Sequence, residues 1–397
     1  MPTLLDWSDE VWEMALTKSI GLATTCSLGL WLAAGCAEET GQMQRWVYFG
    51  TGADHIYVSS FDPDSGALGT PRQAAQFGRP GFLALHPKGE IFYAVGRQGE
   101  QGTGFRGEAA AYAIDLGTGD LNELNRASTT GRGAAHVAVN QAATVLAAVN
   151  YGDGNTVTVA IQADGSLGEP VADMPHSGSS VHPTRQGEPH PHSANFTPDD
   201  LFVIVPDLGT DELVKYSVDP QTAALERTPD PQVRMEPGSG PRHMTFHSNG
   251  RWAYVINELA STVAVMHYQA QTGLLEHVQT ISTLPEGYEG PANTTAEVLV
   301  HPNGQFLYGS NRGSNTIAVF AIDPGDGQLK AVERVPTGGD WPRNFRLSPD
   351  GRFLLVANQR SDSVHVFGVD TGTGRLSPTG ASVAVPNPMC VRFVPAS

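Results

Sequence analysis

The chain has 397 residues, of which 45 are glycine, 28 are proline and 40% are hydrophobic. Its formal net charge is −17, and this acidic balance argues against nucleic-acid binding, because a phosphate backbone attracts a basic surface. The composition excludes an intrinsically disordered chain and is rich in turn-forming residues.

The N-terminal segment resembles an export signal. Residues 20–34 are apolar, follow Lys18 and are too few to span a bilayer comfortably. The run ends in residues 32–36 (LAAGC), which resemble a bacterial lipobox with alanine at the usual leucine position. The residues upstream are acidic, so we place the true start of the signal at Met14.

We therefore predict a signal segment over 1–35, a lipid on Cys36 and a polar tether over 36–45. This predicts an exported protein, either periplasmic or membrane-anchored through that lipid. The alternatives are an amphipathic N-terminal helix and a cytoplasmic protein. Cys26 falls in the removed segment and Cys390 in a strand pattern, so no disulfide is predicted.

Two signatures recur along the rest of the chain. The first is a short β-rich run, a turn and a second β-rich run, typical of a hairpin. It begins at residues 85, 139, 196, 246, 300 and 347. The second is a polar turn that ends in leucine. Its copies are 62–68, 115–121, 162–167, 219–225, 269–275, 323–329 and 370–376.

The seven copies predict seven repeats. Dividing residues 36–397 by seven gives roughly 52 residues each, which suits one four-stranded propeller blade with its loops. Residues 389–394 have the pattern of an innermost strand, and residues 46–50 that of a second strand. Joining them completes one blade and removes exposed edges. We predict an all-β, seven-bladed propeller over 46–397, and two stacked β-sandwiches would not require equal periods.

Several short motifs then resemble one family. They are residues 190–193 (HPHS), 206–211 (PDLGTD), 240–243 (GPRH), 255–259 (VINEL) and 310–313 (SNRG). Their combination resembles the propeller-type 6-phosphogluconolactonase family, to which the fungal carboxymuconate cyclase is related. The resemblance implies an enzyme that acts on a small-molecule lactone without a dedicated cofactor. The active constellation proposed for the cyclase falls by motif on His192, Arg242, Glu258 and Arg312.

The repeats independently place polar residues at one end of the blades. Those just before a first strand are His136, His192, Arg242, His243, Glu297, Arg343 and Asn344, and those just after a second strand are Asn150, Asp207, Glu258, Arg312 and Gln359. Equivalent positions in different blades should converge on one channel mouth. Beside the four candidate catalytic residues, we expect substrate contacts from His136, His243, Asp207, Glu297, Arg343 and Asn344.

This set contains the groups that opening a lactone needs. His192 or Glu258 can transfer protons as general base or acid. Arg242 and Arg312 can stabilise the oxyanion or hold an anionic group through their forked donors. The sequence therefore predicts a lactonase that hydrolyses a sugar-derived lactone by water attack. A muconate-type cycloisomerase and a non-catalytic binding propeller are the alternatives.

Structural roles compete for the same residues. His136 and Asp207 can tie blades together, and Arg242 with Glu258 can be a purely structural ion pair. A metal site at His182, His190 and His192, with Glu188 and Glu297, is a weaker hypothesis, and we assign no metal. Residues 174–191 form a long insertion that we expect to cap the channel.

Overall fold

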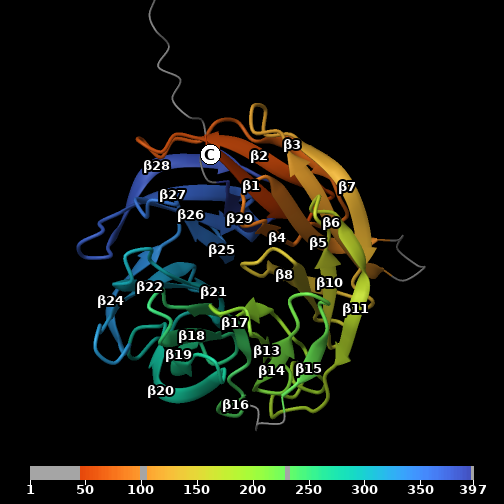
Figure 1. Ribbon diagram of the computed structural model, residues 1–397. Coiled ribbons are helices and arrows are strands. Elements are labelled where there is room, and N and C mark those ends of the chain that lie inside the picture. The colour runs from red at the N-terminus through yellow and green to blue at the C-terminus, as the bar shows by residue number, and fades with distance from the viewer. Residues whose placement is uncertain (1–44, 99–104, 229–232, 395–397) are drawn as a thin grey trace, which may run out of the picture. The chain divides into compact units, whose positions relative to one another are not determined.

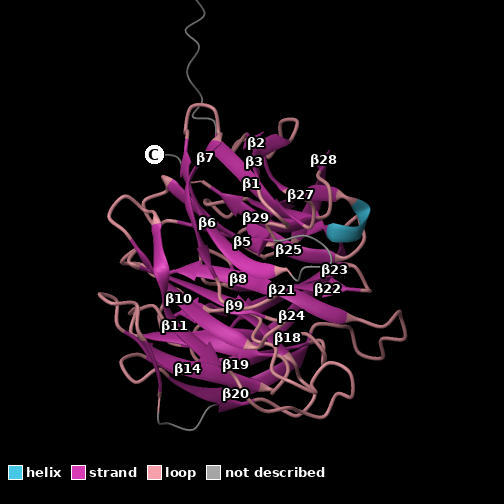
Figure 2. Cartoon of the chain, turned by 90° about the vertical axis from the view of Figure 1, so that its right-hand side faces the viewer, coloured by secondary structure: helices cyan, strands magenta, loops and turns pink. Residues whose placement is uncertain are grey.

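The computed structural model describes residues 45–98, 105–228 and 233–394. They form seven antiparallel sheets around a common centre, which confirms the predicted seven-bladed propeller (Figure 1). The one helical turn in these ranges is the 3-10 segment η1 (Gln359–Ser361), seen in Figure 2. Within the described ranges, no helix is long and apolar enough to cross a membrane. The predicted signal segment, Cys36 and the tether lie outside these residues, except Arg45 at the start of the first strand.

Each sheet has an innermost strand at the centre of the ring and an outermost strand at its rim (Figure 1). In that order the first three sheets are β29 (Pro388–Phe393), β1 (Arg45–Thr51), β2 (His55–Phe61), β3 (Arg72–Gln76); β4 (Phe82–Leu85), β5 (Ile91–Gln98), β6 (Arg106–Ile114), β7 (Leu121–Ser128); and β8 (Ala134–Val139), β9 (Val145–Asn150), β10 (Asn155–Ile161), β11 (Leu167–Pro175).

The other four sheets follow the same order. They are β12 (Asn195–Phe196), β13 (Phe202–Asp207), β14 (Glu212–Val218), β15 (Leu225–Arg227), with β16 (Val233–Arg234) also on β14; β17 (Pro241–Phe246), β18 (Trp252–Asn257), β19 (Thr262–Gln269), β20 (Leu274–Ser282); β21 (Thr294–Val300), β22 (Phe306–Arg312), β23 (Thr316–Ile322), β24 (Leu329–Pro336); and β25 (Pro342–Leu347), β26 (Phe353–Asn358), β27 (Ser363–Val369), β28 (Leu376–Ala384).

The first sheet closes the ring by joining both ends of the propeller. β29 pairs with β1 in antiparallel register, with Val47 opposite Phe393, and the Val394 amide donates to the Trp46 carbonyl at 2.9 Å. This is the mixed blade that the sequence predicts. Closure leaves no inner strand without a neighbour, because β29 also packs between β25 and β4.

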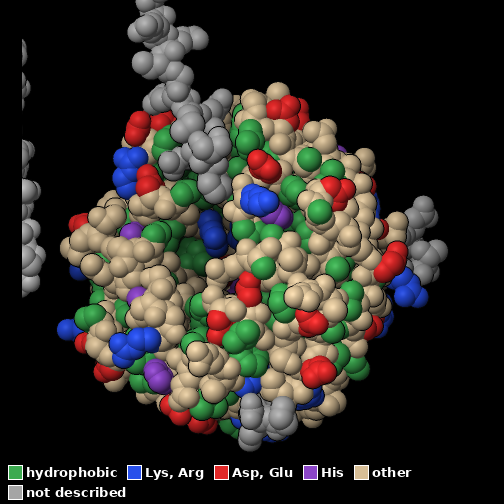
Figure 3. All heavy atoms as spheres, viewed as in Figure 1, with side chains coloured by type: hydrophobic (Ala, Val, Ile, Leu, Met, Phe, Trp, Pro, Cys, Tyr) green, Lys and Arg blue, Asp and Glu red, His purple; other side chains and the backbone are tan. Residues whose placement is uncertain are grey.

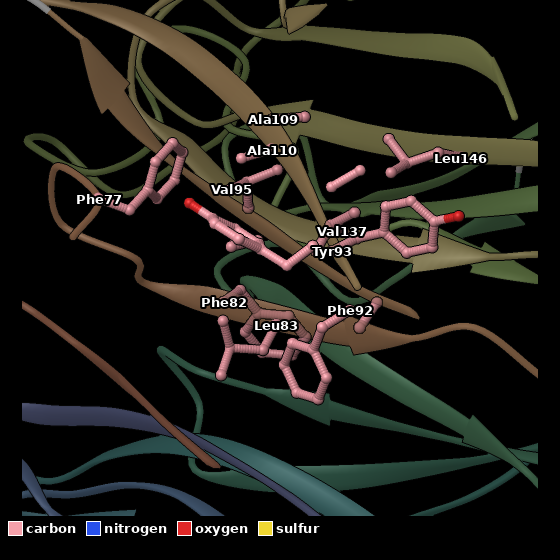
Figure 4. Packing of buried hydrophobic residues seen from close by; sticks show 14 of the residues in the cluster. Phe77, Phe82, Leu83, Phe92, Tyr93, Val95, Ala109, Ala110, Val137 and Leu146 are labelled. Carbon is pink, nitrogen blue, oxygen red and sulfur yellow. The ribbon is translucent and has the colours of Figure 1, made fainter. Parts of the chain in front are cut away.

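The hydrophobic core lies between adjacent sheets. The second strands β9, β18 and β26 are buried at every position, because each is covered on both faces by neighbouring sheets. Figure 4 shows one such contact, where Tyr93 of β5 lies near Val137 and Leu146 of the next sheet, whereas Phe92 points to the other side, toward Tyr48 of the first sheet. The outermost strands alternate between partly buried and exposed residues, as in β11, because only one face is covered.

The leucine-ending turns join the third and fourth strands of each sheet and tie neighbouring sheets together. The Tyr254 hydroxyl donates to the Gly327 carbonyl at 3.1 Å, and tyrosines 48, 93 and 308 make the same bond to glycines 119, 165 and 374. Gly327 has φ +74°, and a Cβ there would lie 2.5 Å from the Trp252 ring. Glycine is thus required by both the backbone and the contact.

β-bulges interrupt the inner strands near the start of several blades. The register shifts between Ala134 and His136 in β8, between Pro241 and His243 in β17, and between Pro342 and Asn344 in β25. A bulge breaks the strict alternation of side chains and re-aims them. Arg242 and Arg343 are the extra residues of the last two bulges, each next to a residue that faces the channel.

Candidate active site

One mouth of the central channel is a cavity of about 900 Å³. Residues near the starts of the inner strands line it, among them Gly81, His192, Thr294, Arg343 and Met389. The space-filling view shows a hollow at the middle of the ring with basic side chains inside it (Figure 3). Three of the predicted catalytic residues, His192, Glu258 and Arg312, line this cavity together.

Glu258 is the centre of the polar cluster. It follows β18 directly, and its amide donates to the Gly240 carbonyl at 2.7 Å, so the backbone is held by the neighbouring bulge. Its Oε2 accepts from Arg242 Nε at 3.1 Å and forms an ion pair with Arg312 Nη2 at 2.8 Å, and its Oε1 accepts from Arg185 Nη2 at 2.7 Å. One carboxylate therefore faces three guanidinium groups.

These neighbours fix the charge of Glu258. Burial alone would raise the pKa of its carboxyl, but Arg312, Arg242, His192 and Arg185 together hold that pKa well below the ordinary value of 4.5. Glu258 is therefore ionised throughout the neutral range. A carboxylate with so low a pKa is a poor proton donor and a weak base.

His192, in contrast to the ionised Glu258, is uncharged at neutral pH. Burial, reinforced by Arg242 and His243, holds the pKa of its imidazole well below 6.5, so the ring is neutral at pH 7. Its Nε2 lies 4.0 Å from Glu258 Oε2, and its Nδ1 has no hydrogen-bond partner in the described part of the chain. The imidazole is thus able to accept a proton beside a carboxylate that would stabilise the resulting cation.

Arg312 and Arg242 hold Glu258 from different positions. Arg312 ends β22, lines the cavity and lies against Trp341, with its guanidinium carbon 5.4 Å from the ring centre. Arg242, the bulge residue of β17, is buried and absent from the cavity lining, and also donates to the Ala296 carbonyl. Arg242 therefore reaches Glu258 from outside the cavity lining.

The sequence interpretation missed two residues of the cluster, Arg185 and Tyr151. Both line the cavity, and Arg185 Nη2 donates to the Tyr151 hydroxyl at 3.2 Å as well as to Glu258. Arg185 belongs to the insertion expected to cap the channel, so its location was predicted but not its role. Tyr151 follows β9 and stacks on His190 with ring centres 4.3 Å apart.

The sequence pattern predicts Asn150 as the residue of this blade that faces the channel mouth, but the residue that does so is Tyr151, one position later. Asn150 and Asp207 pair with residues five positions later, as Asn257, Asn311 and Asn358 do in their sheets. In three blades the residue that follows, Tyr151, Glu258 or Arg312, lines the cavity. A shift of one residue turns a side chain to the opposite face.

Asp207, predicted as a substrate contact, does not line the cavity. Its carboxylate is fully buried, accepts from the backbone amides of His190 and Gly209 at 2.8 and 2.9 Å, and lies 2.7 Å from His176 Nδ1. Asp207 instead anchors both ends of the segment that carries Arg185. It is a structural residue of the insertion.

Four other predicted substrate contacts lie outside this cavity. The Glu297 carboxylate accepts from His243 Nδ1 at 3.0 Å and from the Asn344 amide group. The ring centres of His136 and His243 are 5.2 Å apart, and those of His243 and His192 are 5.4 Å apart. His136, His243, Glu297 and Asn344 therefore extend away from the mouth, and His136 lines a second cavity. None of the four lines the first cavity.

Arg343 is the predicted substrate contact that does line the first cavity. Burial and the charge of Arg312 lower its pKa to about 10, so it remains a cation at neutral pH. In the described residues, no hydrogen bond or ion pair involves its guanidinium. The lining holds six arginines, residues 79, 97, 132, 185, 312 and 343, and Glu258 is its one carboxylate. The cavity is basic within an acidic protein.

The comparison with protein families agrees with this geometry. The family described as "Lactonase, 7-bladed beta-propeller" matches residues 46–393, which span all seven sheets. The chain belongs to this lactonase family. The family assignment predicted from the short motifs is thus confirmed.

Two curated relatives of this lactonase are 6-phosphogluconolactonases. The protein from Bacillus subtilis is 35% identical over 357 residues, covering 89% of this chain and 99% of the relative. The protein from Formosa agariphila is 33% identical over 303 residues, covering 75% and 82%. Among solved structures, the periplasmic gluconolactonase of Pseudomonas aeruginosa is 34% identical, with a TM-score of 0.84 and coverage of 89% of this lactonase and 100% of that chain.

Proposed function

We propose that the protein hydrolyses a sugar-derived lactone, with water as nucleophile and His192 as the general base. The observation that carries this proposal is the convergence of His192, Glu258 and Arg312, from three separate sheets, on one cavity. The family and its 6-phosphogluconolactonase relatives support the same reaction class.

The reaction divides among these residues as follows. Water adds to the lactone carbonyl while its proton passes to the neutral imidazole of His192, and Glu258 stabilises the imidazolium. Arg312, whose buried Nε has no partner among the described residues, stabilises the developing oxyanion. When the ring C–O bond breaks, His192 returns the proton to the departing alkoxide oxygen. Glu258 acts as a charged support and not as a proton donor.

The basic lining favours a lactone that carries an anionic group. Arg343 presents a cationic fork to the cavity without a counter-charge of its own, which suits a phosphate or carboxylate on the substrate. Hydrolysis also generates a carboxylate within this basic site. We therefore propose that Arg343 binds the anionic substituent of the substrate.

Acid release from a panel of lactones, corrected for spontaneous hydrolysis, tests the reaction. We expect His192→Asn to lower kcat by about 100-fold or more, the usual range for a general base. His277→Asn is the matched control, because that histidine is exposed on the outer strand β20. Wild-type turnover in His192→Asn would reject the mechanism.

The role of Arg343 is tested by comparing glucono-1,5-lactone with its 6-phosphate. We expect Arg343→Gln to lower kcat/KM for the phosphorylated lactone by about tenfold or more relative to the neutral one, because a charge-assisted hydrogen bond is lost. Arg375→Gln is the control, since this exposed arginine pairs with Glu333 on the outer strands. An unchanged ratio between the two lactones would exclude anion binding by Arg343.

We also propose that the protein is exported and carries a lipid on Cys36. The apolar run before the LAAGC sequence supports this, as does the likeness to a relative described as periplasmic. Sequencing the mature N-terminus and labelling with a radioactive fatty acid test it. A mature protein that retains residues 14–35 would contradict it.

A further inference from the structure

A second cavity, of about 570 Å³, lies at the opposite end of the inner strands. It is lined by the last residues of six of them, for example Leu85 of β4, Val139 of β8 and Phe246 of β17. The first cavity is lined by the starts of inner strands, and the two linings share no residue. The second cavity is therefore a separate site on the far side of the channel.

Two arginines, Arg346 of β25 and Arg392 of β29, line this second cavity. Their strands pack side by side, and the Val391 amide donates to Asn344 Oδ1 at 2.8 Å. Arg346 lies two residues after Asn344 and so faces the channel as Asn344 does. Burial and the charge of Arg392 lower the pKa of Arg346 to about 10, which leaves the Arg346 guanidinium cationic at neutral pH.

Neither arginine has an ion pair in the described part of the chain. Arg346 makes no hydrogen bond there, and Arg392 Nη1 donates only to the Val391 carbonyl at 2.8 Å. The Arg392 guanidinium carbon lies 4.6 Å from the centre of the Phe82 ring, which orients the group. Most of the ten N–H donors of the two guanidinium groups are therefore without an acceptor.

The carboxylates near this cavity are engaged elsewhere. Glu297 accepts from His243, Asn344 and the Val298 amide. Asp200, at the cavity, accepts from the amides of residues 141 and 142 at 3.1 and 2.9 Å. His136 is neutral, since burial holds its pKa well below 6.5. No side chain in this set satisfies the forks of Arg346 and Arg392.

We propose that the second cavity binds a small oxyanion, a phosphate or a carboxylate, between Arg346 and Arg392. The two neighbouring guanidinium groups are half-buried and no described carboxylate accepts a hydrogen bond from them, so their donors are free for a planar or tetrahedral oxyanion. The cavity volume suits a small molecule, and its apolar wall can accommodate a short carbon skeleton. This site is independent of lactone hydrolysis at the first cavity.

Calorimetric titration with inorganic phosphate and, separately, with gluconate tests the site and distinguishes the two sources of an oxyanion. The titrations use Arg343→Gln protein, in which anion binding at the first cavity is weakened. We expect one of the two anions to bind, and Arg346→Gln added to this background to weaken that binding by about tenfold or more. If neither anion binds, or if Arg346→Gln leaves the affinity unchanged, the proposal is wrong.

Two further measurements separate loss of the site from loss of the fold. The single variant Arg346→Gln should keep kcat and KM for lactones within about twofold of wild type, since the first cavity is intact. The bound anion should raise the Tm of the wild type but not of this variant. If Arg346→Gln does not fold, Arg346→Lys keeps the charge without the fork and should bind with reduced affinity. Wild-type affinity in Arg346→Lys would contradict recognition by a guanidinium fork.

Discussion

Replacing Glu258 with glutamine tests whether this carboxylate compensates buried charge. The side chains of Glu258, Arg242 and Arg312 are 5%, 3% and 5% exposed, whereas that of Arg185 is 35% exposed. The variant leaves two buried cations without a counter-ion, and breaking a buried pair in this way costs about 3–5 kcal/mol. The pair with Arg185 adds little, because solvent screens it.

For a domain of this size, that loss lowers Tm by about 4–7 °C. Urea unfolding followed by fluorescence and a calorimetric scan measure the change. Glu123→Gln is the matched control, because Glu123 is 40% exposed in its pair with Arg126 and its loss should cost less than about 1 kcal/mol. If the two variants lose the same stability, Glu258 does not compensate buried charge.

The pH dependence of the stability difference between wild type and Glu258→Gln gives an independent check of the role of Glu258. The folded-state pKa of Glu258 is depressed, so its contribution is complete above the ordinary value of 4.5 and disappears as the pH falls through the lower folded value. The stability difference between wild type and Glu258→Gln should therefore be constant from pH 6 to 8 and shrink below pH 4.5. A difference that grows on acidification would refute the assignment.

Three further predictions follow from other parts of the structure. Because the pKa of His192 is lowered, kcat/KM should be flat from pH 6.5 to 8 and fall only at lower pH. Glu258→Gln should move that fall to still lower pH, since Glu258 favours the imidazolium. A pH–rate profile with its acid limb above pH 6.5 would contradict this. Gly250→Ala should lower the free energy of unfolding by about 1 kcal/mol, because Gly250 has a positive φ. Gly327→Ala should lower it by about 1–3 kcal/mol more, because the added Cβ also meets Trp252. Equal losses for the two variants in urea unfolding would contradict the packing argument. Deleting β29 should cause the protein to unfold or aggregate, because β1 becomes an exposed edge. Size-exclusion chromatography measures this, and a monomeric, folded product would show that ring closure is dispensable.

The propeller could be predicted from the sequence because its repeats are local. Each turn ending in leucine, such as 323–329, contains its own turn signal and connects two strands next to it in the chain. The blade shared by β29 and β1 followed from counting, since one strand was missing at each end. These features depend on spacing, which the sequence displays directly.

The site was harder to predict because it depends on single-residue register. Glu258 and Arg312 line the cavity as expected, whereas Tyr151 lines it where Asn150 was expected, and Asp207 is buried away from it. Bulges at Arg242 and Arg343 also alter the alternation, and no composition signal distinguishes a bulge from a regular strand. Arg185 comes from a long insertion whose path depends on tertiary hydrogen bonds to Asp207.

The pairing of β1 with β29 in one sheet means that the assembled ring does not depend on where the polypeptide starts among the blades. A short linker from Val394 to Trp46, which are hydrogen-bonded at 2.9 Å, could join the ends, and new termini could be opened in the exposed turn at Gly250. Such a circular permutant would keep His192, Glu258 and Arg312 in their sheets. The propeller is thus a suitable scaffold for insertion into another protein through a site of choice on its rim.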